Sequence, residues 1–143
     1  RAADYLSRLN VRGPGGRDLH AVWGQEPQAY LGSAVPGFPN FFMMYGPNSN
    51  AGPVVFMLEV QAKFAADSIR AAHRAGKSVV EVSAEAARKY NDWLQRRLES
   101  SVFKSTNNYF AGPTGRIVTQ WPFSATRFWF IARTSRRRVM KMK

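Results

Sequence analysis

The stretch that decides the fold is residues 40–53, which read Asn-Phe-Phe-Met-Met-Tyr-Gly-Pro-Asn-Ser-Asn-Ala-Gly-Pro. A short apolar run, Asn40 to Tyr45, is followed by glycine, proline and asparagine, which are the residues that dominate turns. Apolar runs of this length between turn formers are typical of buried strands. The stretch therefore predicts a buried strand over 40–45 that ends in a tight turn.

A helix is predicted directly after this turn, over residues 53–75. Proline suits the first helical position, and Gly76 suits the position just past the end. Apolar residues recur at helical spacing on two stripes, and a helix that is apolar on two sides packs between two layers. Such a helix needs packing partners on both sides.

The rest of the chain alternates between strand-like and helical patterns. Residues 78–82 predict a short strand, and Ser83 is a plausible N-cap for a second helix over 84–101. Residues 103–130 are rich in aromatic residues and turn formers, so they predict two extended segments and a small β-rich tail. The predicted fold class is α/β.

The turn before the first helix is the best candidate for a binding site. Glycine and small polar residues ahead of a helix let backbone N–H groups face a ligand, and the helix start adds partial positive charge. Such a site suits a phosphate or the electron-rich edge of a reduced flavin. The same residues also fit an ordinary strand-to-helix loop.

Composition limits the possible functions. The formal charge is +12, and residues 100–143 hold nine Lys or Arg and no acidic residue. The basic block of Arg136, Arg137, Arg138, Lys141 and Lys143 fits either a solvated tail or a surface for phosphate or nucleic acid. The absence of cysteine excludes a disulfide framework and cysteine-based catalysis, and fits a cytoplasmic protein. No apolar run is long enough for a membrane span.

Several segments together resemble a known family. They are Pro27 to Gly32, Val35 to Phe42, Tyr45 to Asn50, Phe56 to Gln61 and Trp93 to Leu98, followed by Tyr109-Phe110, Gly115-Arg116 and Trp121-Pro122. This combination is similar to the C-terminal part of Baeyer–Villiger and related class B flavin monooxygenases, and it covers nearly the whole chain. The glycine-rich GxGxxG fingerprints, which precede this region in the family, are not in this sequence.

The resemblance implies a flavoprotein with two dinucleotide-binding domains, of which this chain holds the last strand and helix of the FAD domain (1–76) and a C-terminal α+β segment with a basic tail (77–143). It implies FAD, NADPH and O2, used to oxygenate a small-molecule ketone, sulfide or amine. The fragment alone is expected to be inactive, and its catalytic residues to lie upstream. Because most of the FAD-domain sheet is also absent, the resemblance implies that one face of the helix over 53–75 is uncovered, with Met43, Val55 and Phe64 as candidates for the uncovered surface. The alternative is a small basic nucleic-acid-binding module. The cofactor-binding residues implied are Gly46, Pro47, Asn48, Ser49, Asn50 and Tyr109.

Overall fold

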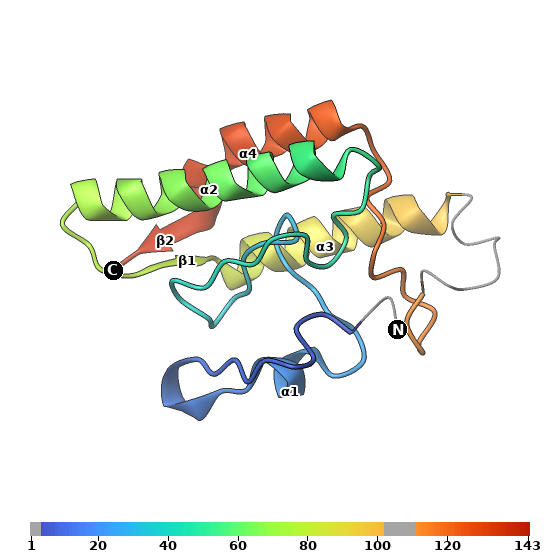
Figure 1. The fold of residues 1–143 in the computed structure, drawn as a ribbon, viewed down its shortest axis with the longest axis horizontal. Helices are drawn as coiled ribbons and strands as arrows, with labels where there is room; N and C mark the ends of the chain where they lie inside the picture. Colours follow the sequence, from blue (N-terminus) through green and yellow to red (C-terminus); the bar gives the residue numbers. More distant parts are fainter. Residues whose placement is uncertain (1–3, 102–110) are drawn as a thin grey trace.

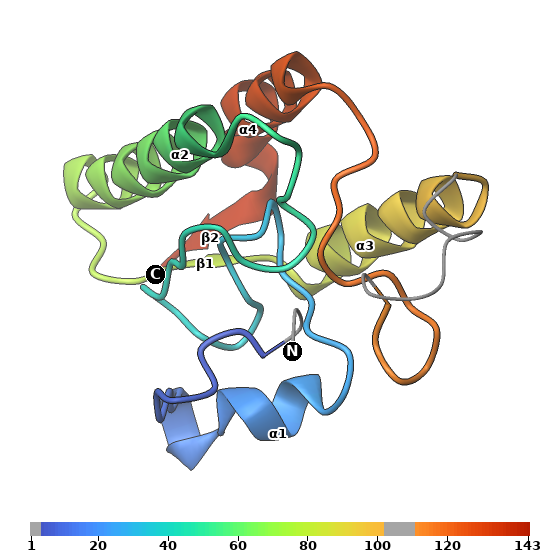
Figure 2. The ribbon, with the colours of Figure 1, turned by 45° about the vertical axis from the view of Figure 1, so that its right-hand side comes forward.

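The computed structural model describes residues 4–101 and 111–143, which form a mixed helix-and-strand structure (Figure 1). The elements, in chain order, are η1 (Pro14–Gly16), α1 (Leu19–Trp23), α2 (Val54–Arg74), β1 (Val80–Val82), α3 (Ala84–Glu99), α4 (Ala125–Val139) and β2 (Met140–Met142). α2 and α4 lie side by side, and α1 lies at the opposite end of the molecule in both ribbon views (Figures 1 and 2). β1 and β2 form an antiparallel pair in which Val80 faces Met142 and Val82 faces Met140.

Local sequence signals explain where the helices begin and end. The Ser83 side chain accepts a hydrogen bond from the Ala86 N–H at the start of α3, and Ser124 does the same for α4. Gly76, with a φ of +67°, follows the end of α2. The predicted helices over 53–75 and 84–101 and the predicted strand over 78–82 are therefore confirmed, within a residue or two at their ends.

Two clusters of buried side chains hold the chain together. The larger one joins α2, both strands, α3 and α4, with Met57, Leu94 and Phe128 fully buried. The smaller one gathers Leu19, Trp23, Val35, Phe38 and Met43 around α1. The larger cluster includes residues on both sides of position 76, and the division into domains at 76/77 stays a prediction about the complete protein.

The predicted strand over 40–45 is wrong. Asn40 and Tyr45 have φ angles of +59° and +54°, so both ends of the segment adopt left-handed backbone that breaks an extended strand. Phe42 makes one isolated bridge to Ala34. Asn40 instead binds β1 directly, since its side-chain oxygen accepts from the Val80 N–H at 2.9 Å and its own N–H donates to the Val80 carbonyl at 2.8 Å.

The predicted β-rich tail is wrong over residues 125–139, which form α4, and the part of the prediction over 103–110 lies outside the described residues. Phe128, Ala132, Ser135 and Val139 are buried at helical spacing, which places them on one stripe. This stripe packs against α2 and overrides the strand preference of the aromatic and β-branched residues in the segment. The basic residues 136–138 form the last turn of α4, and Lys141 belongs to β2, so they are not a loose tail.

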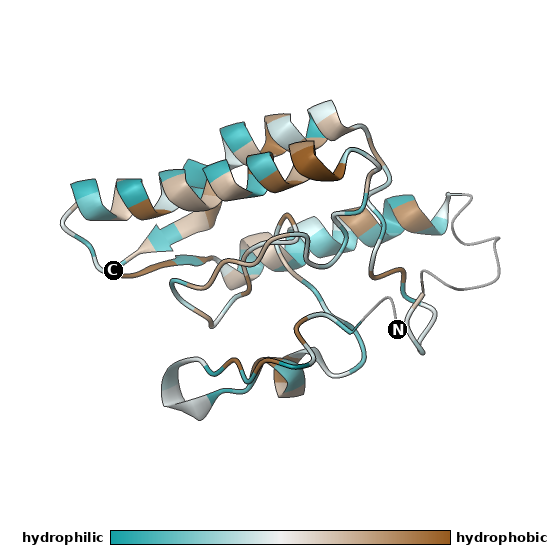
Figure 3. Ribbon diagram, in the orientation of Figure 1, coloured by the Kyte–Doolittle hydropathy of each residue, from teal (hydrophilic) through white to brown (hydrophobic). Residues whose placement is uncertain are grey.

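The uncovered apolar surface differs from the expected one. Met43 and Phe64 are buried, whereas Val55 is 70% exposed. Val54 and Phe56 are exposed beside it, so the first turn of α2 is a hydrophobic surface patch (Figure 3). α2 thus buries one stripe of side chains and leaves its N-terminal end apolar and open to solvent.

Candidate functional site

The Gly-Pro-Asn turn is clasped by the segment over 117–121. The Asn48 side-chain N–H2 group donates to the carbonyls of Ile117, at 2.8 Å, and Gln120, at 3.0 Å, and the Asn48 backbone N–H donates to Val118. Asn48 has a φ of +56°, which asparagine tolerates better than most residues. The turn therefore owes its shape to a segment about 70 positions later in the chain.

Gln61 ties the same turn to α2 from the other side. Its side-chain oxygen accepts a hydrogen bond from the Tyr45 N–H at 2.7 Å, and its side-chain nitrogen donates to the Leu31 carbonyl at 2.8 Å. Gln61 is 1% exposed, so both bonds lie away from water, where unpaired amide groups are costly. One side chain thus fixes where α2 lies relative to two turns.

Close packing at Gly32 and Gly46 completes the clasp. The Gly46 N–H donates to the Gly32 carbonyl at 3.0 Å. A Cβ atom at Gly32 would lie 2.8 Å from the Ser49 Cβ, and Gly32 has a φ of +60°. Only glycine meets both conditions without strain. We name the set of Gly32, Gly46, Asn48, Ser49 and Gln61 the turn clasp.

The structure brings the predicted site residues 46–50 together, but buries most of them. Gly46, Pro47, Asn48 and Ser49 are buried, and Asn50 is half-buried. The backbone N–H groups of Gly46, Asn48 and Asn50 all donate to carbonyls within the chain. The remaining predicted site residue, Tyr109, lies outside the described residues. Backbone donors for a ligand are therefore to be sought in the residues after the turn.

The start of α2 offers such donors. Its N-cap is Pro53, which gives no side-chain hydrogen bond to the helix. The first turn, over 54–56, is exposed. The Val54 N–H donates to the Gly52 carbonyl at 2.8 Å, whereas the N–H groups of Val55 and Phe56 make no hydrogen bond within the described residues, as is usual at a helix start. An uncapped, exposed helix start carries partial positive charge that suits an anionic or electron-rich group.

Two buried oxygen atoms beside the clasp lack partners. The Asn48 side-chain oxygen and the Thr119 hydroxyl are buried without a hydrogen bond to any of the described residues. Buried polar atoms are nearly always paired in native proteins, by protein, water or ligand. These two oxygen atoms could therefore form hydrogen bonds to a bound polar molecule or to a further part of the protein.

The titratable side chains of Glu59, His73 and Tyr30 do not form a catalytic arrangement. Glu59 and His73 both lie on α2 and are exposed. The Tyr30 hydroxyl donates to the Ser135 hydroxyl at 2.6 Å, and burial raises the pKa of Tyr30, which keeps it neutral. Within the described ranges, 4–101 and 111–143, no cluster of acidic or histidine side chains could hold a metal ion, and no helix is long and apolar enough to cross a membrane.

Comparison with curated proteins points to one enzyme class. The chain is 35% identical over 136 residues to the FAD-binding monooxygenase ktnD of Aspergillus niger, which covers 90% of this chain and 22% of that protein. It is 36% identical over 132 residues to a Baeyer–Villiger monooxygenase of Pseudomonas aeruginosa, covering 89% and 25%. The chain thus spans about a quarter or less of the length of these relatives. No family model matches the sequence.

Solved structures of monooxygenases share the fold of this chain. Cyclohexanone monooxygenase from Rhodococcus sp. Phi1 bound to NADP+ superposes with a TM-score of 0.88 at 21% identity, over 99% of this chain and 28% of that one, which concerns the fold alone. An oxidised steroid monooxygenase bound to NADP matches with a TM-score of 0.84 at 26% identity, over 96% and 27%. In both, the aligned part is a minor share of a longer chain.

Proposed function

This chain is homologous to the C-terminal region of Baeyer–Villiger-type flavin monooxygenases, and on that premise we propose that it forms one wall of the flavin site of such an enzyme. In the complete protein, FAD, NADPH and O2 would oxygenate a small-molecule ketone or a soft sulfide or amine. The chain by itself would not carry out the reaction, because the glycine-rich dinucleotide-binding fingerprints are not in its sequence.

The observation that carries this proposal is the turn clasp together with the open start of α2. Gln61 and Asn48 hold the turn rigidly through buried hydrogen bonds on both sides. The turn leads directly into an exposed helix start that lacks a side-chain cap. Rigid support behind an open electropositive end is what positions a cofactor accurately.

FAD would supply the redox chemistry, while the residues of this chain would position and shield it. Backbone N–H groups at the start of α2 would face the electron-rich edge of the flavin ring. The apolar side chains of Val54, Val55 and Phe56 would exclude water from that edge. Gly46, Pro47, Asn48, Ser49 and Asn50 would then shape the site from behind, and Tyr109 would lie near the nicotinamide cofactor.

Domain exchange tests this proposal. The matching C-terminal region of the Pseudomonas aeruginosa relative is replaced by this chain, and NADPH oxidation is measured with and without a ketone. We expect the chimera to bind FAD and to oxidise NADPH faster when a ketone is present. We expect no NADPH oxidation above background from the 143-residue chain alone.

The control is the same relative truncated before the exchanged region. If the folded chimera, with FAD bound, is no more active than the truncated relative, this chain does not complete the site and the proposal fails. A chimera with Gly32→Val, which would force a side chain against Ser49, serves as a second control and should lose activity.

A further inference from the structure

A second, separate feature lies on the surface between α3 and the start of α4. It is a shallow hollow of about 420 Å³, lined by Trp93, Arg96, Arg97, Ser100, Phe123 and Arg127. We name it the arginine–aromatic hollow. None of its residues belongs to the turn clasp or to the start of α2, so the inference drawn from it is independent of the proposed function.

The aromatic residues of the hollow hold its arginines in place. Trp93 and Phe123 stack with ring centroids 4.8 Å apart and an angle of 9° between the planes. The Arg127 guanidinium carbon lies 4.2 Å from the Phe123 centroid and 5.4 Å from the Trp93 centroid. A guanidinium over a ring keeps its N–H donors free for a planar, two-pronged hydrogen bond to an oxyanion.

A second guanidinium lies near the same ring without a carboxylate to balance the two charges. The Arg97 guanidinium carbon is 5.8 Å from the Phe123 centroid. In the part of the chain that the structure describes, neither Arg97 nor Arg127 makes an ion pair with an acidic side chain. Both guanidinium carbons lie within 6 Å of the Phe123 centroid, so their positive charges add at the hollow, and a bound anion would offset them.

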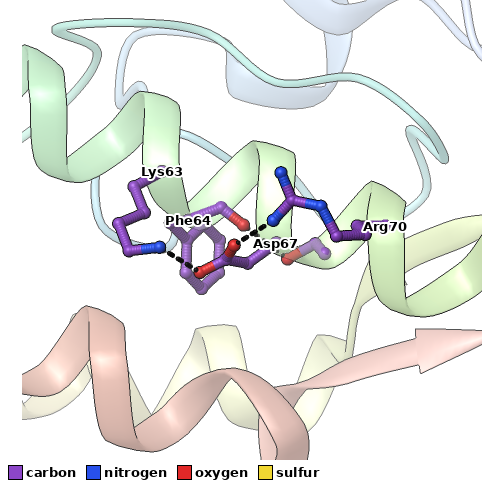
Figure 4. Close-up of polar contacts among 5 residues, drawn as sticks. Lys63, Phe64, Asp67 and Arg70 are labelled. Carbon is purple, nitrogen blue, oxygen red and sulfur yellow. Dashed lines mark hydrogen bonds and ion pairs between the residues drawn. The ribbon is translucent and has the colours of Figure 1, made fainter.

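On α2, by contrast, the charge of two basic residues is neutralised in part by an acidic side chain. Lys63 and Arg70 converge on the Asp67 carboxylate, at 3.0 and 2.8 Å (Figure 4). These two ion pairs lower the pKa of Asp67 against a desolvation effect that raises it. That surface already contains its own anion. The arginine–aromatic hollow, by contrast, lacks one among the described residues.

We propose that the arginine–aromatic hollow binds the phosphate group of a phosphorylated small molecule. A phosphate dianion matches two guanidinium groups better than a carboxylate does, because it carries more charge and three strong acceptor oxygens. The hollow is larger than a lone phosphate needs, and the half-buried rings of Trp93 and Phe123 offer an apolar surface for an attached organic group. Free phosphate and phosphate esters share this chemistry, and the test below separates them.

The test is calorimetric titration of the full 143-residue chain with pyrophosphate, with ADP and with adenosine, at about 0.15 M salt so that diffuse attraction is screened. We expect pyrophosphate and ADP to bind and adenosine not to bind. Equal affinity for pyrophosphate and ADP would assign binding to the phosphates alone, whereas tighter binding of ADP would add the aromatic surface. No binding of either phosphate compound, or equally good binding of adenosine, would overturn the proposal.

Substitutions locate the site. Arg97→Gln and Arg127→Gln should each weaken pyrophosphate binding about tenfold, which is the usual loss for a charge-assisted hydrogen bond. Arg127→Lys, which keeps the charge but loses the planar fork, should show an intermediate loss. The matched control is Arg133→Gln, on the same helix and also over an aromatic ring, Trp129, at 5.5 Å. Equal weakening by Arg133→Gln would mean diffuse charge attraction and would refute the site, and circular dichroism verifies the fold of each variant.

Discussion

The buried Gln61 side chain accepts a hydrogen bond from the Tyr45 backbone N–H, 2.7 Å away, and so joins α2 to the turn that precedes it. The same side chain donates to the Leu31 carbonyl. Gln61→Leu keeps a similar volume but leaves the Tyr45 donor and the Leu31 acceptor unpaired. Each unpaired buried group costs about 1–3 kcal/mol, so we expect a loss of roughly 2–5 kcal/mol in the free energy of unfolding.

Urea denaturation followed by circular dichroism measures this loss. The matched control is Glu59→Gln, at an exposed position of the same helix, which should change the free energy of unfolding by less than about 0.5 kcal/mol. If both variants unfold at the same urea concentration as the parent chain, the hydrogen bonds of Gln61 do not support the turn clasp.

Gly32 should be irreplaceable because an added Cβ atom would collide with Ser49. Gly76 serves as the comparison, because it lacks such a neighbour. Gly32 and Gly76 have similar φ angles, +60° and +67°, so alanine strains the backbone at both. At Gly76 the added Cβ meets nothing within 4 Å, whereas at Gly32 it meets Ser49 at 2.8 Å. We expect Gly76→Ala to cost about 1 kcal/mol and Gly32→Ala clearly more, as measured by thermal unfolding. Equal costs would show that the contact with Ser49 relaxes freely.

Buried tyrosines predict a loss of stability at alkaline pH. Burial raises the pKa of Tyr90 well above its ordinary value of 10.0, and it also raises the pKa of Tyr30. The unfolded chain ionises near pH 10 while the folded chain keeps these hydroxyls neutral. Their contribution is therefore complete below pH 10 and is lost as the pH rises toward the raised values. Urea denaturation at stepwise higher pH should show this fall, and a Tyr30→Phe, Tyr90→Phe double variant should show a shallower one. Identical slopes for the two proteins would contradict the assignment.

The exposed first turn of α2 predicts marginal stability for the chain on its own. Val54, Val55 and Phe56 remain exposed, and burying a side chain of this kind contributes about 1.5–3 kcal/mol out of a typical total of about 5–15 kcal/mol. We expect the chain to unfold below about 60 °C or to aggregate, as followed by circular dichroism and light scattering. Val55→Ser should reduce aggregation without lowering the unfolding temperature. A sharp transition well above 60 °C from a soluble monomer would show a self-sufficient domain.

Sequence patterns predicted the parts of the fold that local chemistry controls. The serine cap at 83, the proline at 53 and the glycine at 76 located α2 and α3 almost to the residue. α4 was not predicted because Phe128, Trp129, Phe130 and Ile131 favour strands. The Ser124 cap and packing against α2 override that preference. The helical spacing of Phe128, Ala132, Ser135 and Val139 is the sequence pattern that could have indicated this helix.

The position of the Gly-Pro-Asn turn was predictable from the sequence, but its structure was not, and its role in binding stays a prediction. The Gly-Pro-Asn turn and the helix after it were identified from residues 46–53, and the turn lies where expected. The contacts that shape it are not local: Asn48 binds the carbonyl of a residue 69 positions away, and Gln61 reaches back 30 positions to Leu31. Side-chain contacts over such separations leave no periodic trace in one sequence. As a result, the burial of the turn and the role of Gln61 came only from the structure.

We propose that this chain forms one wall of a flavin site but does not bind the flavin on its own. Fluorescence titration of FAD with the 143-residue chain tests this claim most directly, with the domain-exchange chimera as the positive control. We predict weak binding or none by the chain and stoichiometric binding by the chimera. Tight, one-to-one binding of FAD by the isolated chain would contradict the claim.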